Sequence, residues 1–135
     1  MFEKDYIIRL LNQFFEDLNA FLHKKKAVNK QEDWQNIYNA YTGDYTFYHT
    51  AGMDEILKSF DTYEGEERTY RMQILAELYL QETRTVLLSP EDKKALLEKS
   101  LLIWEYIDRN SDTYSIERKQ RIDSINDRLQ EYRKS

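Results

Sequence analysis

The sequence predicts an all-α fold of about five to seven helices in antiparallel hairpins. Only three Gly and one Pro occur among 135 residues, whereas a β-sandwich or barrel needs many turns, which recruit those two residue types. The charged residues are mostly strong helix formers. Apolar residues also recur at three- and four-residue steps, which places them on one helix face. A chain of this length fits one domain, so we expect residues 1–135 to form a single helical domain.

The first predicted helix covers residues 3–26. Its apolar stripe consists of Ile7, Leu10, Leu11, Phe14, Leu18, Phe21 and Leu22. Ile8 and Phe15 widen this stripe, so we expect the first helix to be central in the bundle. The lysines at 24–26 suit the negative end of the helix dipole.

The middle of the chain predicts shorter elements. A helix over 32–41 places Trp34, Ile37, Tyr38 and Tyr41 on one face, and Gly43 is a natural stop for it. Residues 42–53, between two glycines, are expected to be the least regular stretch. A short helix should follow over 53–60.

Three helices are predicted in the second half. The first covers residues 66–88, with an apolar stripe of Met72, Leu75, Leu78, Tyr79, Val86 and Leu87. The sequence Ser89-Pro90-Glu91-Asp92 predicts the next start, because Ser caps a helix and Pro suits its first position. That helix should end near Asn110. A peripheral helix over 115–133 presents a narrow stripe of Ile122, Ile125, Leu129 and Tyr132.

Charge and targeting signals limit the class of protein. The net charge of −5 divides into +2 over 1–30, −9 over 31–112 and +2 over 113–135. Either two basic end helices pack on an acidic middle, or the asymmetry marks an electrostatic partner site. The absence of Cys excludes disulfides and thiolate sites. The chain shows no signal-peptide pattern and no apolar run near the ~20 residues that span a bilayer, so we expect a cytoplasmic protein without a membrane anchor.

The first nine residues, Met-Phe-Glu-Lys-Asp-Tyr-Ile-Ile-Arg, match the pattern M-F-E-x-D-Y-I-x-R. This opening resembles a family of small bacterial helical proteins of unknown function. Beyond residue 26 the resemblance is one of layout, and the middle here is rich in aromatic residues where the family tends to be leucine-rich. The resemblance implies helical hairpins similar to tetratricopeptide repeats toward the C-terminus, and it implies no activity for any residue.

The tetratricopeptide likeness is local. Leu75-Ala76-Glu77-Leu78-Tyr79 fits the L-G-x-x-Y element with Ala as the small residue. Ser100 and Trp104 suit the next helix, whereas Ile107 is too large for its position. The spacing from Tyr79 to Ser100 also exceeds a standard repeat, so an ordinary antiparallel helix pair explains the pattern equally well.

No catalytic or metal-binding pattern is evident. Neither His23 nor His49 has a His or carboxylate at ligand-like spacing. No Ser lies in a G-x-S-x-G elbow, and adjacent acids such as Glu66 and Glu67 suit helix starts. We therefore predict no catalytic residue, metal ligand or cofactor. The basic residues of the last helix alternate with acidic ones, and the whole chain is acidic, which argues against nucleic-acid binding.

The aromatic segment is the most unusual feature of the sequence. It contains Trp34, Tyr38, Tyr41, Tyr45, Phe47 and Tyr48. Tyr carries an apolar ring and a hydroxyl, so it suits half-exposed positions. These rings either pack under the irregular stretch or form a partner-facing groove, because aromatic residues concentrate at binding hot spots. The leading hypothesis is a non-enzymatic protein–protein interaction module that binds an unidentified protein or itself. The alternative is a small-molecule-binding or enzymatic domain with a pocket near residues 41–49.

Overall fold

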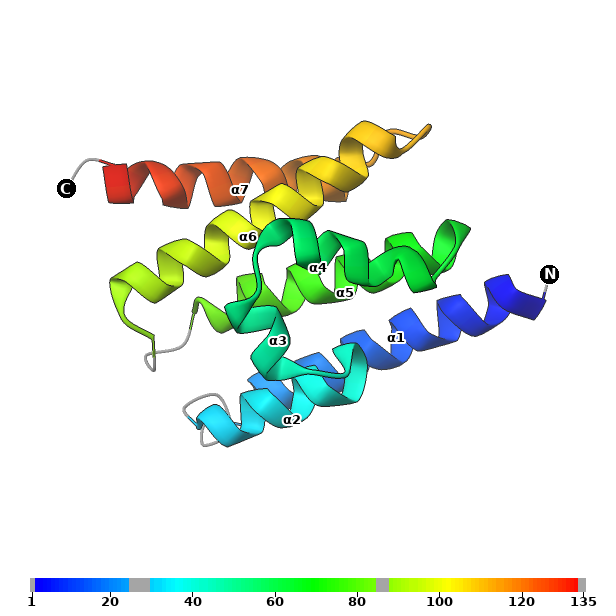
Figure 1. The fold of residues 1–135 in the computed structure, drawn as a ribbon, viewed down its shortest axis with the longest axis horizontal. Helices are drawn as coiled ribbons and strands as arrows, with labels where there is room; N and C mark the ends of the chain where they lie inside the picture. The colour runs from blue at the N-terminus through cyan, green and yellow to red at the C-terminus, as the bar shows by residue number, and fades with distance from the viewer. Residues whose placement is uncertain (1, 25–29, 85–87, 134–135) are drawn as a thin grey trace.

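The computed structural model describes residues 2–24, 30–84 and 88–133, and its regular elements in these ranges are all helices (Figure 1). A short 3₁₀ helix, η2 (Phe60–Thr62), follows the fourth α-helix. The α-helices are α1 (Phe2–Leu22), α2 (Gln31–Thr42), α3 (Tyr45–Thr50), α4 (Met53–Ser59), α5 (Gly65–Glu82), α6 (Pro90–Asn110) and α7 (Ile116–Arg133). The predicted all-α class is confirmed.

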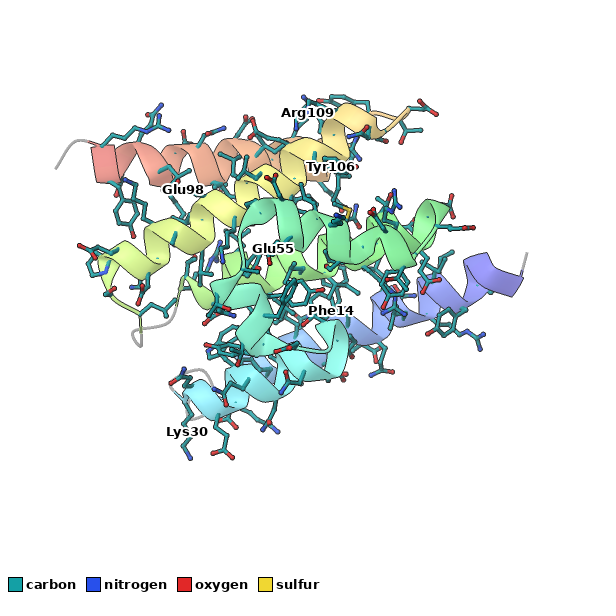
Figure 2. All side chains as sticks on the ribbon, viewed as in Figure 1. Phe14, Lys30, Glu55, Glu98, Tyr106 and Arg109 are labelled. Carbon is teal, nitrogen blue, oxygen red and sulfur yellow. The ribbon has the colours of Figure 1, made fainter. Side chains whose placement is uncertain are left out.

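The helices are arranged in layers around α5. The antiparallel pair of α1 and α2 lies along one side of α5, and α6 and α7 lie along the other (Figure 1). The short helices α3 and α4 cross one face of the central layer. Phe14, labelled in Figure 2, belongs to the buried core on the inner side of α1.

Helix α5 is the centre of the structure, which corrects the expectation that the first helix would be. Every residue from Ile74 to Leu80 is buried, and α5 contacts α1, α2, η2 and α6. In contrast, Tyr6, Ile8 and Phe15 of α1 are 50%, 40% and 37% exposed. The physical reason is that the one charged residue in this run, Glu77, is paired with Arg121 at 2.6 Å, so all sides of α5 can be buried here, whereas α1 has one polar face that stays in water.

Helix α6, the second helix of the α5–α6 hairpin, begins where the sequence predicts. Ser89 caps α6 by accepting a hydrogen bond from the Asp92 N–H at 3.1 Å, and Pro90 occupies the first turn. The two helices approach closely at small residues, where the Ser100 hydroxyl donates to the Ala76 carbonyl at 2.8 Å. The tetratricopeptide likeness of this pair stays a prediction.

The predicted irregular stretch contains a helix, which corrects the expectation for residues 42–53. Gly43 ends α2 in the left-handed conformation with φ of 93°. Asp44 then caps α3 by accepting from the Phe47 N–H at 3.1 Å. An Asp directly after a helix-stopping Gly is a strong start signal, so the cap was present in the sequence.

Two helices end earlier than predicted. Helix α1 ends at Leu22 and not at Lys26, because the chain tightens there and the Lys24 N–H bonds the Phe21 carbonyl. Helix α5 ends at Glu82, where the Thr83 hydroxyl donates to the Leu80 carbonyl. The remaining predicted helical residues Lys25, Lys26, Val86 and Leu87 lie outside the described residues.

Candidate functional site

The six aromatic residues predicted to bind a partner lie together, but they differ in exposure. Trp34, Tyr38 and Tyr48 are buried in the core. Tyr41, Tyr45 and Phe47 are partly exposed and pack against the core with one side of the ring. The surface of the aromatic segment is therefore formed by these last three rings.

A buried carboxylate organises the inner side of this segment. The Glu82 side chain is 3% exposed and accepts a hydrogen bond from the Tyr38 hydroxyl at 2.6 Å. The His49 Nε2 atom lies 2.8 Å from the same oxygen, and the Tyr45 hydroxyl lies 3.5 Å from the other. We call Tyr38, Tyr45, His49 and Glu82 the Glu82 cluster. It joins α2, α3 and α5.

The contacts of His49 limit what the Glu82 cluster can do chemically. The Nδ1 atom of His49 lies 2.8 Å from the Tyr45 carbonyl oxygen, and Nε2 faces Glu82. A carbonyl can only accept, so Nδ1 carries a proton and donates it. Both ring nitrogens are thus engaged, and His49 has no unused lone pair for a substrate or a metal ion.

Two side-chain hydrogen bonds to the backbone of α3 join it to α5 and α6. The Tyr48 carbonyl accepts from the Tyr79 hydroxyl at 2.5 Å and from Lys99 Nζ at 3.1 Å. Burial lowers the pKa of Lys99. Burial, followed by the charge and hydrogen bond of Glu82, raises the pKa of Tyr38 well above its ordinary value. Tyr79 and Lys99 therefore connect α3 to α5 and α6.

An open groove lies on the other side of α2, between α1 and α2. Its volume is about 430 Å³. The groove is lined by Asp17, Ala20, Phe21, Lys24, Asp33, Asn36, Ile37, Ala40 and Tyr41. We call this the α1–α2 groove. Of the predicted partner-binding residues, Tyr41 lines it directly.

Aromatic packing gives the α1–α2 groove rigid walls. The Tyr41 ring meets Phe14 edge-on at 5.1 Å between centroids, and Phe21 meets Trp34 in the same way at 4.7 Å. The Tyr41 hydroxyl donates to Asp17. Burial and this hydrogen bond raise the pKa of Tyr41 above its ordinary value. The ring is therefore fixed at both ends, with its hydroxyl protonated.

Sequence reasoning missed Glu82, the residue that organises the cluster. Glu82 lies three and four residues after Tyr79 and Leu78, so it continues the buried stripe of α5. A charged residue on such a stripe is rarely buried without partners. The spacing of Glu82 from Leu78 and Tyr79 therefore indicated a buried carboxylate with hydrogen-bond donors facing it. It could not identify His49 or Tyr38 as those donors.

The described residues offer no group of three or more His, Asp and Glu side chains that could hold a metal ion. Among the helices described, none is long and apolar enough to cross a membrane. Comparison of the chain with protein-family models, curated proteins and solved structures found no match. The geometry of the site is therefore the basis for the function.

Proposed function

We propose that the chain is a protein–protein interaction module whose docking site is the α1–α2 groove. The observation that carries this proposal is the combination of a preformed groove with fixed aromatic walls at Phe21 and Tyr41. Rigid aromatic side chains contribute most of the binding energy at interfaces, because they bury area at a low cost in entropy.

The lining of the groove indicates the chemistry of the partner. Phe21, Ile37 and Tyr41 offer apolar surface, which suits one bulky apolar side chain of the partner. Asp17, Asp33 and Lys24 also line the groove, so the lining holds two carboxylates and one ammonium group. The groove therefore favours a partner segment that carries a basic residue beside its apolar anchor.

The Glu82 cluster supports this proposal indirectly. Its hydrogen-bonding groups are directed at one another and at the backbone of α3, so it stabilises the wall behind the groove. The alternative, a small-molecule or enzymatic site near residues 41–49, would require His49 to leave one of its two partners. A thermal-shift screen against metabolites and metal ions tests it, because ligands of the native state raise the melting temperature.

A matched pair of tryptophan substitutions tests the docking site. Ala40 lines the groove and Ala95 lies on α6, and both are exposed on helices. Ala40→Trp fills the groove without entering the core, whereas Ala95→Trp adds the same side chain elsewhere. The two variants and the unaltered protein are used as bait in its native lysate, and the bound proteins are quantified by mass spectrometry.

We expect Ala40→Trp to weaken capture of a specific partner at least about tenfold, which is roughly 1.4 kcal/mol, and Ala95→Trp to leave it unchanged. Circular dichroism and melting curves confirm that both variants are folded. Sedimentation of the purified unaltered protein and of both variants tests binding to a second copy. Here too Ala40→Trp should weaken the association and Ala95→Trp should not. Equal behaviour of the two variants in both experiments would contradict a docking role for the groove.

A further inference from the structure

A second concave site, which shares no lining residue with the α1–α2 groove, lies where the end of α5, the start of α6 and the end of α7 meet. Its volume is about 450 Å³. It is lined by Thr83, Pro90, Lys93, Arg128, Glu131 and Tyr132. We call it the Arg128 pocket. A volume of this size fits a small organic ligand.

Arg128 differs from the other partly buried arginines that the structure describes. Each of the others has a carboxylate partner: Arg68 with Asp61, Arg71 with Glu67, Arg118 with Asp108, and Arg121 with Glu77. The Nη2 atom of Arg128 instead donates to the Thr83 carbonyl at 3.4 Å. Its Nη1 atom is buried and has no hydrogen-bond partner among the described residues.

The placement of the Arg128 guanidinium group is energetically costly. A buried guanidinium nitrogen without an acceptor loses its hydration and gains nothing in return. Burial, followed by the positive charge of nearby Arg84, lowers the pKa of Arg128. The two guanidinium groups therefore repel each other, and a bound anion would relieve both costs.

The charges around the pocket are unbalanced. Arg128 and Lys93 line it and Arg84 lies close by, whereas Glu131 is the one acidic residue in the lining. In the described part of the chain, neither Arg84 nor Lys93 has a carboxylate within 4.0 Å. The start of α6 at Pro90 adds the positive end of a long helix.

We infer that the Arg128 pocket binds the phosphate group of a small phosphorylated molecule. Arg128, Lys93 and the nearby Arg84 outnumber Glu131, the one carboxylate in the lining, and a phosphomonoester brings two negative charges where a carboxylate brings one. The guanidinium group binds phosphate with two parallel hydrogen bonds. The rest of the pocket, including Tyr132 and Pro90, accommodates an organic group beside the phosphate.

Phosphate-dependent stabilisation tests this assignment. The melting temperature is measured with inorganic phosphate, phenyl phosphate, phenylacetate or a short single-stranded oligonucleotide, each against chloride at equal ionic strength. Affinity for phenyl phosphate is then measured by calorimetry for the unaltered protein, Arg128→Gln, Arg84→Gln and Arg109→Gln. Arg109 lies at the opposite end of α6 (Figure 2) and is exposed, so it provides the control.

We expect both phosphates to raise the melting temperature, phenyl phosphate more than inorganic phosphate, and phenylacetate to have little effect. Arg128→Gln should weaken phenyl phosphate at least about tenfold, while its ligand-free melting temperature is unchanged or higher because an uncompensated charge is removed. Arg84→Gln is an exposed change that keeps the fold and should weaken binding less. Arg109→Gln should bind normally.

Three results would overturn the assignment. The first is no stabilisation by either phosphate beyond the chloride control. The second is equal stabilisation of the unaltered protein and of the Arg128→Gln and Arg84→Gln variants. The third is stabilisation by the oligonucleotide alone, which would assign the basic groups to a nucleic-acid backbone and not to a small phosphorylated molecule.

Discussion

Glu82 shows, at the scale of a single residue, how the fold accommodates a buried charge. A buried carboxylate is costly unless hydrogen-bond donors replace its water. Here Tyr38 and His49 supply donors at 2.6 and 2.8 Å. The sequence places Glu82 on the buried stripe of α5, so its burial could be predicted. The donors come from 33 and 44 residues earlier in the chain, and no local pattern connects them.

Replacing this carboxylate should destabilise the protein. In Glu82→Gln the side chain keeps its size but loses its charge, so the hydrogen bonds from Tyr38 and His49 lose their charge assistance. We expect a loss of about 1–3 kcal/mol in the free energy of unfolding, measured by urea denaturation. The control is Glu98→Gln on the exposed side of α6 (Figure 2), which should change stability by less than about 0.5 kcal/mol. Equal effects would show that Glu82 is not the organising residue.

At the scale of the element, α3 illustrates why local signals were not sufficient. A helix of six residues is too short to be stable by propensity, because nucleation costs more than its few hydrogen bonds return. Asp44 marks its start in the sequence. Its stability comes from Tyr79 and Lys99, which donate to the Tyr48 carbonyl from α5 and α6. Contacts this distant in sequence could not be predicted, so residues 42–53 were expected to be irregular.

Removing one of these donors should loosen α3 selectively. Tyr79→Phe deletes the hydroxyl and leaves Lys99 as the single side-chain donor to the Tyr48 carbonyl. We expect a loss of about 0.5–1.5 kcal/mol and faster hydrogen exchange at the Tyr48 and Ala51 amides, whose bonds define α3. Exchange in the middle of α6 should change less.

Tyr106→Phe provides the matched control for this change. Tyr106 is a half-buried tyrosine on α6 (Figure 2), and none of the hydrogen bonds described for the protein involves its hydroxyl. This variant should leave the exchange of α3 unchanged. Exchange that accelerates uniformly over the whole protein in Tyr79→Phe would contradict a local role for the hydroxyl.

At the scale of the whole molecule, the helical class and most helix positions could be predicted, because periodicity and caps are local properties. Ser89 and Pro90 specified the start of α6, and Gly43 the end of α2. The central position of α5 was missed, although residues 74–80, in which Glu77 is the one charged residue, carried the signal. The α1–α2 groove could not be predicted, since its shape depends on how Phe21 and Tyr41 meet their neighbours across two helices.

The buried tyrosines predict how the whole molecule responds to alkaline pH. Burial is the first cause that raises the pKa values of Tyr38 and Tyr79. In the unfolded chain these groups ionise near pH 10. Stability is therefore complete below about pH 10 and falls above it, by up to about 1.4 kcal/mol per pH unit for each fully buried tyrosine.

Ultraviolet absorbance of tyrosinate and circular dichroism, recorded together during an alkaline titration, measure this response. The rise in tyrosinate absorbance that comes from the buried hydroxyls of Tyr38 and Tyr79 should coincide with the loss of helicity. Ionisation of all the tyrosines while the helices remain intact would contradict the hydrogen-bonded, buried state of Tyr38 and Tyr79.

The most direct test of the docking site is site-specific photocrosslinking in living cells. A photoreactive phenylalanine derivative is placed at Ala40, in the α1–α2 groove, or at Ala95, on the exposed side of α6. A docking groove predicts a discrete crosslinked product of one partner, or of a second copy of the chain, from position 40 and not from position 95. No product from position 40, or the same products from both positions, would contradict the proposal that this groove is where the protein binds its partner.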